Sequence, residues 1–245
     1  MYSLTEVDSV PPEIGVYAWY ACPSIGAADW LKATDPATED DLGTERLHNL
    51  LIAYTRKLDP SSFWIEARSS FQYTWRGQLN PSLMTEYDTT FVSPRETAES
   101  SDVPKGERDR ARKIWKSLQT QKRRGALTEL ITKSNPDLSS PIYIGKSKNM
   151  RDRVTTHAKT FRKYSDALSA EPHRRDEMLE YIRSSDKNFG ARAAALNFSA
   201  DELFVVPCTI KENVSASLNE AEQEQIAESF EWLLNRWFRP ICGRL

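Results

Sequence analysis

The sequence contains few cysteines, few histidines and no long hydrophobic run, and each scarcity excludes a class of protein. Its three cysteines lie far apart and form no Cys-x-x-Cys pair, which excludes a disulfide framework and a cysteine zinc site and fits a reducing compartment. Three histidines are too few for a multi-histidine metal cluster. No apolar run approaches the ~18 residues that a membrane-spanning helix needs, and the first residues lack the basic and apolar regions of a secretory signal. We therefore expect a cytoplasmic protein with no membrane partner.

Glycine-rich sequence motifs are also missing. No phosphate-binding loop of the Walker or dinucleotide type is present, and no serine lies in a Gly-x-Ser-x-Gly turn. The composition is otherwise that of a globular protein, because 39% of the 245 residues are hydrophobic and 28% are charged. The length predicts one or two domains.

Charge is distributed unevenly along the chain, although the whole protein has a net charge of only −2. Residues 1–104 have a net charge of −9, residues 105–163 of +12 and residues 164–245 of −5. A positive block of this size attracts phosphate polyanions such as nucleic acids. The competing interpretation is a solvated helix face whose charges pair with the acidic flanks.

Hydrophobic periodicity predicts an α/β region built from the two ends of the chain. We expect strands over residues 13–22, 141–145 and 203–210, and an amphipathic helix that includes Met150 to Phe161. A long helix is expected over residues 215–238. Its expected inward residues are Leu218, Ile226, Phe230, Leu233, Leu234 and Trp237.

The central part of the chain is predicted to be mostly helical, with one hairpin. A helix is expected around Leu47–Leu58, and two β-type runs, Phe63–Ala67 and Phe71–Trp75, form a plausible hairpin. Residues 80–104 read as an exposed loop. A basic helix over about residues 108–124 precedes a shorter helix that is expected to stop at Ser134-Asn135-Pro136.

Short strings at the two ends of the chain form an ordered set. Gly15-Val16-Tyr17 lies on the first strand and Tyr143-Ile144-Gly145 on the second. Arg153 stands ten residues after Tyr143, and His157 follows four residues later. Glu231 lies nine residues before Pro240. This arrangement resembles the GIY-YIG nuclease superfamily, and the run from Tyr143 to Val154 is similar to the incision nuclease of bacterial excision repair.

The resemblance implies a small, mainly antiparallel GIY-YIG-like sheet flanked by helices, formed by residues 1–24 and 138–245. Residues 25–137 are then an inserted, mostly helical subdomain that carries the hairpin and is a candidate for DNA recognition. Two features depart from the family. About 125 residues separate the motif strands, which the family usually joins by a short connection, and Gly243 stands where the family often has an asparagine.

The residue types suit phosphodiester hydrolysis, which needs an activated water, a Lewis acid and positive charge near the phosphate. Glu231 is the candidate ligand for Mg²⁺ (or Mn²⁺), because Mg²⁺ accepts few protein ligands and keeps several waters. Arg153 is expected to clamp the phosphate, and His157 to orient or deprotonate water or to hold Tyr17. The resemblance gives Tyr17 the role of base or water-positioner.

Tyr143 is expected to support Tyr17, and Lys146 to join Arg153 in lowering the pKa of the Tyr17 phenol. Several of these residues also have a simpler, structural interpretation. The two tyrosines alternatively cap a sheet core, His157 is a satisfied core histidine, and Glu231 is a helix-edge carboxylate in water.

Cations outside the motif are candidates for contact with the nucleic-acid backbone. Three cations cluster near the expected start of the helix that follows the second motif strand: Lys146, Lys148 and Arg151. Backbone N–H groups at the start of a helix favour an anion. The basic helix of the insert supplies the remaining candidates: Arg112, Lys113, Lys116, Lys122, Arg123 and Arg124.

We therefore expect a Mg²⁺-dependent endonuclease that cleaves DNA, with restriction or defence as the slightly favoured role. One site with one metal cuts one strand, so double-strand cleavage requires a homodimer or repeated nicking. Two alternatives remain open: a catalytically impaired GIY-YIG-like module that binds nucleic acid without turnover, and a nuclease that acts on RNA or in repair.

Overall fold

The computed structural model describes residues 1–37, 39, 41–58, 63–68, 74–79, 105–171, 173, 177–179, 181–182, 188–214 and 217–243. The chain forms two compact units. Unit 1 comprises Met1–Ser24 with Thr132–Leu245, and unit 2 comprises Ile25–Ile131. The expected fold class is confirmed, since a small antiparallel sheet is flanked by helices and a mostly helical insert carries a hairpin. No helix in the described part of the chain is both long and apolar enough to cross a bilayer.

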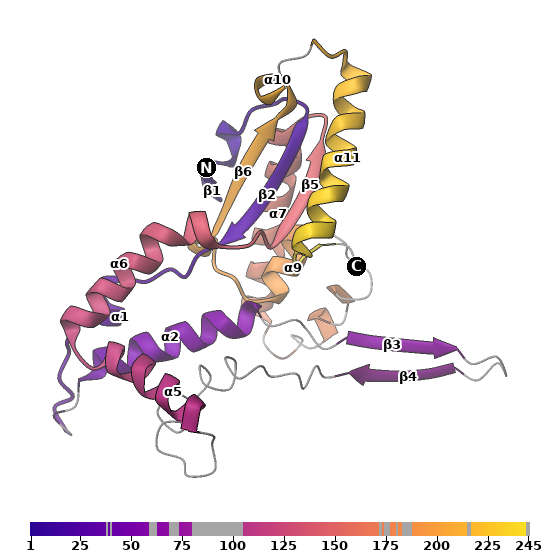
Figure 1. Cartoon of the computed structure of the whole chain (residues 1–245). Helices are drawn as coiled ribbons and strands as arrows, with labels where there is room; N and C mark the ends of the chain where they lie inside the picture. Colours follow the sequence, from indigo (N-terminus) through magenta and orange to yellow (C-terminus); the bar gives the residue numbers. More distant parts are fainter. Residues whose placement is uncertain are drawn as a thin grey trace. The chain divides into compact units, whose positions relative to one another are not determined.

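Unit 1 is built on a four-stranded antiparallel sheet (Figure 1). Its order is β1 (Tyr2–Ser3), β6 (Leu203–Thr209), β2 (Gly15–Ala21) and β5 (Tyr143–Ser147). The two motif strands are therefore neighbours despite the long insert. Their register pairs Tyr17 with Gly145, which places these two residues side by side.

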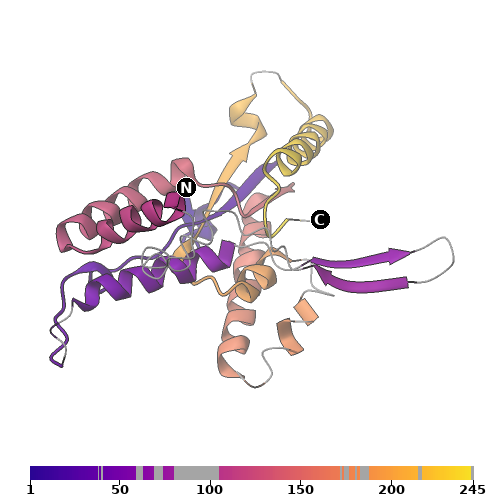
Figure 2. The same ribbon diagram turned by 60° about the horizontal axis from the view of Figure 1, so that its bottom comes forward.

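One face of the sheet is covered by α7 (Met150–Ala170) and α9 (Phe189–Ala195), which lie against each other (Figure 2). The expected period of α7 is confirmed. Its buried stripe follows helical spacing and consists of Met150, Val154, His157, Ala158, Phe161 and Leu168. Asn149 caps the helix, because its side chain accepts a hydrogen bond from the backbone N–H of Asp152. The 3-10 helix η1 (Val7–Ser9) also packs on α7.

The other face is covered by α11 (Glu220–Phe238), which contacts β5 and β2. The core between them contains Val16, Ile144 and Ala227, with Phe230 and Leu234 packed against it. The 3-10 helix η3 (Ala200–Glu202) precedes β6, and α10 (Ile210–Asn213) follows it.

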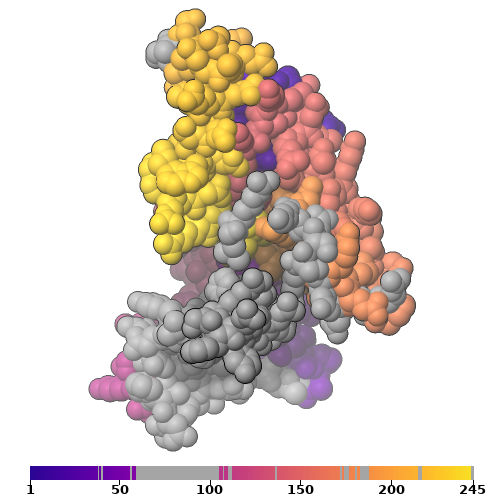
Figure 3. All heavy atoms as spheres, turned by 90° about the vertical axis from the view of Figure 1, so that its right-hand side faces the viewer, coloured from indigo at the N-terminus to yellow at the C-terminus, as the bar shows by residue number. Residues whose placement is uncertain are grey.

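The sequence prediction for α11 was wrong in two respects. The helix begins at Glu220 rather than Ser215, because Asn219 and Glu222 form a capping box there. Ile226 and Trp237 were expected inward, but their side chains are 44% and 64% exposed. The inward stripe runs through Ala227 instead, and α11 forms a broad part of the molecular surface in Figure 3.

Unit 2 contains α1 (Ala27–Trp30), α2 (Leu42–Leu58), the hairpin β3 (Phe63–Arg68) with β4 (Thr74–Leu79), and α5 (Lys105–Leu118). The first part of α6 (Gln121–Leu138) belongs to it as well. Its core joins Leu47, Leu51 and Leu118. Residues 71–73, predicted to begin the second hairpin strand, and residues 80–104, predicted as a loop, lie outside the described residues.

The prediction of a single basic helix over residues 108–124 was wrong, because the helical conformation is interrupted at Gln119–Thr120, between α5 and α6. Two arginines stabilise this break by donating hydrogen bonds to carbonyls at the end of α5. Arg123 Nη1 donates to the Lys116 carbonyl at 3.0 Å, and Arg124 Nη1 to the Leu118 carbonyl at 2.8 Å. α6 then continues through Pro136, where the sequence predicted its end.

Candidate active site

Tyr17 and His157 form a buried hydrogen-bonded pair. Tyr17 lies on the central strand β2, and its Oη is 2.8 Å from Nε2 of His157 on α7. Both side chains are less than 2% exposed. Gly145 makes this position of the Tyr17 ring possible, because a Cβ at Gly145 would lie 2.7 Å from Tyr17 Oη. The glycine of the second motif string therefore forms the floor under the tyrosine of the first.

The pair extends to a third residue, Asn188. Its Oδ1 lies 3.1 Å from Nδ1 of His157 and also accepts the backbone N–H of Gly190 at 2.8 Å. Asn188 is the N-cap of α9, and Gly190 lets α9 approach closely, because a Cβ there would collide with backbone atoms of His157 and Phe161. The result is a continuous chain of polar contacts from the sheet through α7 to α9.

Aromatic rings enclose this chain of polar groups. Tyr143 and Phe189 pack edge-on against the His157 ring, with centroids 5.4 and 5.7 Å away, and Trp19 stacks on Phe189 at 4.9 Å. Rings packed in this way fix the plane of the imidazole. Tyr143 therefore supports the Tyr17–His157 pair through packing.

Burial keeps both members of the pair uncharged at neutral pH. It raises the pKa of Tyr17 far above the usual value of a phenol, and the neighbouring Tyr143 acts in the same direction. Burial also lowers the pKa of His157 to about 4. Asn188 partly opposes that shift in the pKa of His157, and the positive charge of Arg153 adds to it.

Arg153 is the charged group of this cluster. It lies one helical turn before His157 on α7, is exposed to solvent, and interacts with the Tyr17 hydroxyl so that it lowers the pKa of Tyr17. Four of the residues predicted as catalytic are therefore together on the α7 face of the sheet: Tyr17, Tyr143, Arg153 and His157.

Lys146 is not part of this cluster. Alternation along β5 turns Lys146 to the α11 face, opposite to Gly145, and its Nζ pairs with Glu228 Oε2 at 2.8 Å. The expectation that Lys146 joins Arg153 in lowering the pKa of Tyr17 was therefore wrong. Lys148 lies on the same side of the sheet and pairs with Glu224 at 2.5 Å, which raises the pKa of Lys148.

The predicted phosphate seat at the start of α7 is occupied by groups of the chain itself. Arg151 Nε donates to the Val10 carbonyl at 2.9 Å, and the side chain of Asn149 caps the helix. Lys148 is held by Glu224. The sequence showed the cations but gave no sign of these acceptors, which come from distant parts of the chain.

Glu231 lies half-buried on α11. Glu224 and Glu228 show that α11 runs antiparallel to β5, since they pair with Lys148 and Lys146 in that order. Because successive helical residues turn by about 100°, Glu231 shares the flank of these two glutamates. It therefore lies about one turn further on along α11, the helix that covers the opposite face of the sheet from α7.

Glu231 is the single carboxylate predicted to hold a magnesium ion. The described residues contain no group of three or more histidine, cysteine, aspartate or glutamate side chains that could enclose a metal. Mg²⁺ is commonly held by one or two carboxylates together with water and substrate phosphate, and a half-buried Glu231 fits that pattern.

The cations of the insert divide into exposed and structural groups. Lys113, Lys116 and Lys122 are exposed, and so is Arg112, which lies 3.5 Å from Asp109. Arg123, also exposed, uses its guanidinium at the end of α5.

Arg124, predicted to contact DNA, is fully buried. Its guanidinium pairs with Asp41 at 2.8 Å, which lowers the pKa of Asp41 against the effect of burial. It also donates to Thr44 and to the carbonyls of Trp30 and Leu118. The prediction of DNA contact was wrong for Arg124, because its guanidinium is buried and bonded to residues of unit 2.

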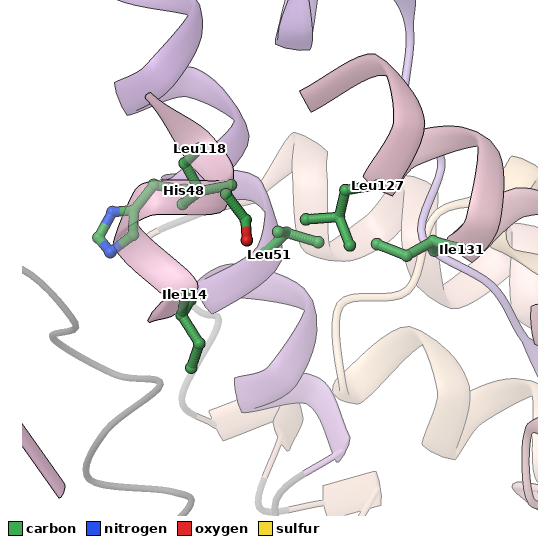
Figure 4. A pocket seen from close by; sticks show the side chains of 7 residues that line it. His48, Leu51, Ile114, Leu118, Leu127 and Ile131 are labelled. Carbon is green, nitrogen blue, oxygen red and sulfur yellow. The ribbon is translucent and has the colours of Figure 1, made fainter. Parts of the chain in front are cut away.

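A separate hollow of about 230 Å³ lies in unit 2 between α2, α5 and α6 (Figure 4). Its lining is mostly apolar and includes Leu51, Leu118 and Ile131, with His48 and Ser117 as polar members. None of the predicted catalytic side chains lines this hollow.

Sequence reasoning did not identify Asn188. The usable signal was local: an asparagine followed two residues later by glycine, and then by the alanine-rich run Ala191–Ala195, predicts a capped helix that packs closely against another element. Nothing in the sequence indicated that this element is α7.

Comparison of the chain with protein-family models, curated proteins and solved structures finds no match. The resemblance to GIY-YIG nucleases therefore rests on the motif residues of the sequence alone.

Proposed function

We propose that this protein is a Mg²⁺-dependent endonuclease that hydrolyses phosphodiester bonds of DNA. The observation that carries the proposal is the hydrogen bond between Tyr17 and His157 with the Arg153 guanidinium beside it. These three groups come from two segments far apart in the sequence, β2 and α7, and together they combine a proton acceptor with a phosphate-binding cation.

The pair provides a route for a proton without a free tyrosinate. A phenol hydroxyl is both donor and acceptor, so Tyr17 can take a proton from water while its own proton moves to Nε2 of His157. The water oxygen forms a bond to phosphorus, the bond to the ester leaving oxygen breaks, and that oxygen takes a proton from solvent. The low pKa of His157 keeps its ring unprotonated at neutral pH and ready to accept.

Arrival of a phosphate strengthens the base. The charge of Arg153 contributes to the low pKa of His157, and a phosphate bound to Arg153 offsets that charge. The pKa of His157 then rises only in part, because burial, the main cause of the low pKa, remains. This coupling links proton transfer to substrate binding.

Glu231 is the proposed ligand for Mg²⁺ or Mn²⁺. Such a cation, when bound, stabilises negative charge on the phosphate. Glu231 and Arg153 lie on opposite faces of the sheet, so the proposal requires one phosphate to reach both residues around the edge strand β5. The exposed lysines of unit 2 (Lys113, Lys116 and Lys122) are proposed to contact the DNA backbone, and a homodimer would cut both strands.

The test is plasmid nicking by wild type, Glu231→Gln, Arg153→Ala and Tyr17→Phe, with Mg²⁺, Mn²⁺ or EDTA. Each variant is expected to lose about 100-fold or more in rate, because each removes one group that stabilises or activates the transition state. Glu220→Gln is the matched control, since it makes the same change on the same helix three turns earlier and is expected to stay within about threefold of wild type. A Glu231→Gln variant that nicks at the wild-type rate would falsify the assignment of the metal ligand, and parallel assays on RNA test the substrate.

A second function is favoured by one observation, the burial of Tyr17. Only 1% of its side chain is exposed, as suits a protein that has kept the fold and binds nucleic acid without turnover. That function predicts DNA binding by wild type, with a salt dependence that Lys113→Gln, Lys116→Gln and Lys122→Gln reduce together, and no nicking with any metal.

A further inference from the structure

The orientation of the Asn188 side chain is fixed by the backbone. The Gly190 N–H can only donate, so the Asn188 atom 2.8 Å away must be the carbonyl oxygen rather than the amide nitrogen. The same oxygen is 3.1 Å from Nδ1 of His157. An oxygen acceptor requires a donor on the other side, and Nδ1 of His157 must therefore carry a hydrogen.

This assignment determines the rest of the chain of hydrogen bonds. A neutral imidazole carries one N–H, so a hydrogen on Nδ1 leaves Nε2 with a free lone pair. The only group hydrogen-bonded to Nε2 among the described residues is Tyr17, at 2.8 Å, and its hydroxyl must be the donor.

We propose that Asn188 is a positioning residue that holds His157 in the Nδ1–H tautomer, so that Nε2 is ready to take the Tyr17 proton. The inference rests on the proposed nuclease function. Asn188 never touches substrate in this scheme and acts only through His157. Once Nε2 is protonated, Nδ1–H continues to donate to Asn188 Oδ1 and stabilises the imidazolium.

The packing of α9 keeps Asn188 in place. Gly190 brings α9 against the α7 backbone, and Phe189 stacks on Trp19 and meets the His157 ring edge-on. The neutral amide also sets the strength of the base, because an oxygen without net charge favours the imidazolium less than a carboxylate would. Among the residues that the structure describes, the other titratable groups around His157 are Tyr17 on β2, Tyr143 on β5 and Arg153 on α7 itself.

The tautomer can be measured by NMR of ¹⁵N-labelled histidine in the full chain, which contains only two other histidines. The His157 signals are assigned by their loss in His157→Gln. We expect a protonated Nδ1 and an unprotonated Nε2 in wild type near pH 7. A protonated Nε2, or an equal mixture of the two tautomers, overturns the proposal.

Asn188→Asp tests the role of Asn188 without loss of the helix cap, because aspartate also caps helices and offers an oxygen to Nδ1. The added negative charge is expected to raise the pH midpoint of His157 by about one unit or more. The acid limb of the nicking profile should move upward equally. Asn149→Asp, the same change at the N-cap of α7, is the control and should leave the midpoint of His157 unchanged.

The outcomes separate the two proposals. An unmoved His157 midpoint in Asn188→Asp overturns the positioning role even if wild type nicks DNA. The expected tautomer and midpoint shift, found with a wild type that does not nick, overturn the proposed function and with it the catalytic purpose of Asn188. The expected NMR result together with a displaced nicking profile supports both proposals.

Discussion

The two faces of the four-stranded sheet hold polar groups in opposite ways. On the α7 face, Tyr17, His157 and Asn188 form a chain of uncharged, buried hydrogen bonds. On the α11 face, Lys146 and Lys148 form ion pairs with two glutamates of α11 at the surface. Side chains of β5 alternate between the two faces, so Tyr143 packs beside the buried chain and Lys146 belongs to the ion pairs.

The difference teaches how each face can contribute to function. A buried, neutral chain of hydrogen bonds holds its atoms in fixed positions, because breaking it leaves polar atoms without water. Exposed ion pairs contribute little to the free energy of unfolding. The α7 face therefore holds its polar atoms in fixed positions, whereas the α11 face carries charged side chains near the surface.

Gly190→Ala is expected to have the largest effect on stability, because it disrupts the close packing of α9 on α7 beside the buried hydrogen bonds. The new Cβ would collide with backbone atoms of His157 and Phe161, which cannot move aside as a flexible side chain would. We expect the free energy of unfolding to fall by about 3 kcal/mol or more, measured by denaturant unfolding. Gly106→Ala is the control, since nothing lies within 4 Å of its Cβ and a helical alanine should stabilise α5 slightly. Equal stabilities of the two variants would contradict the close contact of α7 and α9.

A fall in pH is expected to have the next largest effect on stability, through His157. The folded pKa of His157 is about 4, below the ordinary value of 6.5, so the unfolded chain binds a proton first as the pH falls. The contribution of neutral His157 is present above pH 6.5 and is lost between pH 6.5 and 4. It amounts to about 3 kcal/mol if no other group compensates.

The measurement is the free energy of unfolding at several pH values for wild type and His157→Gln. Glutamine does not titrate, so the difference between the two proteins isolates the histidine from the carboxylates. Parallel curves for the two proteins between pH 6.5 and 4 would show that His157 does not titrate as described.

The smallest effect on stability is expected on the α11 face. Lys146→Met and Lys148→Met each remove one exposed ion pair, and we expect the free energy of unfolding to change by less than about 1 kcal/mol. The change should shrink further in high salt. A loss that approaches that of Gly190→Ala would mean that these pairs organise the fold as strongly as the buried chain does.

The sequence predicted those features that depend on local periodicity. Strand β2 and the buried stripe of α7 follow directly from alternation and from spacings of three and four residues. The pairing of Tyr17 with His157 followed from the motif resemblance, which places both residues on facing elements.

Features that depend on distant partners could not be predicted. The burial of Arg124 depends on Asp41 and Thr44, which are far away in the chain. The exposure of Trp237 depends on which stripe of an equally apolar helix the sheet selects. Asn188 became recognisable only through its contact with His157, 31 residues before it.

The central position of β2 has a consequence for how the protein is made. Both of its sheet partners come much later in the chain, β5 at residues 143–147 and β6 at residues 203–209. During synthesis β2 therefore stays unpaired until the whole of unit 2 has been translated. An exposed strand of this kind invites aggregation and is a natural client for a chaperone. Slow translation of the segment between Gly15 and Thr209 should therefore lower the yield of folded protein.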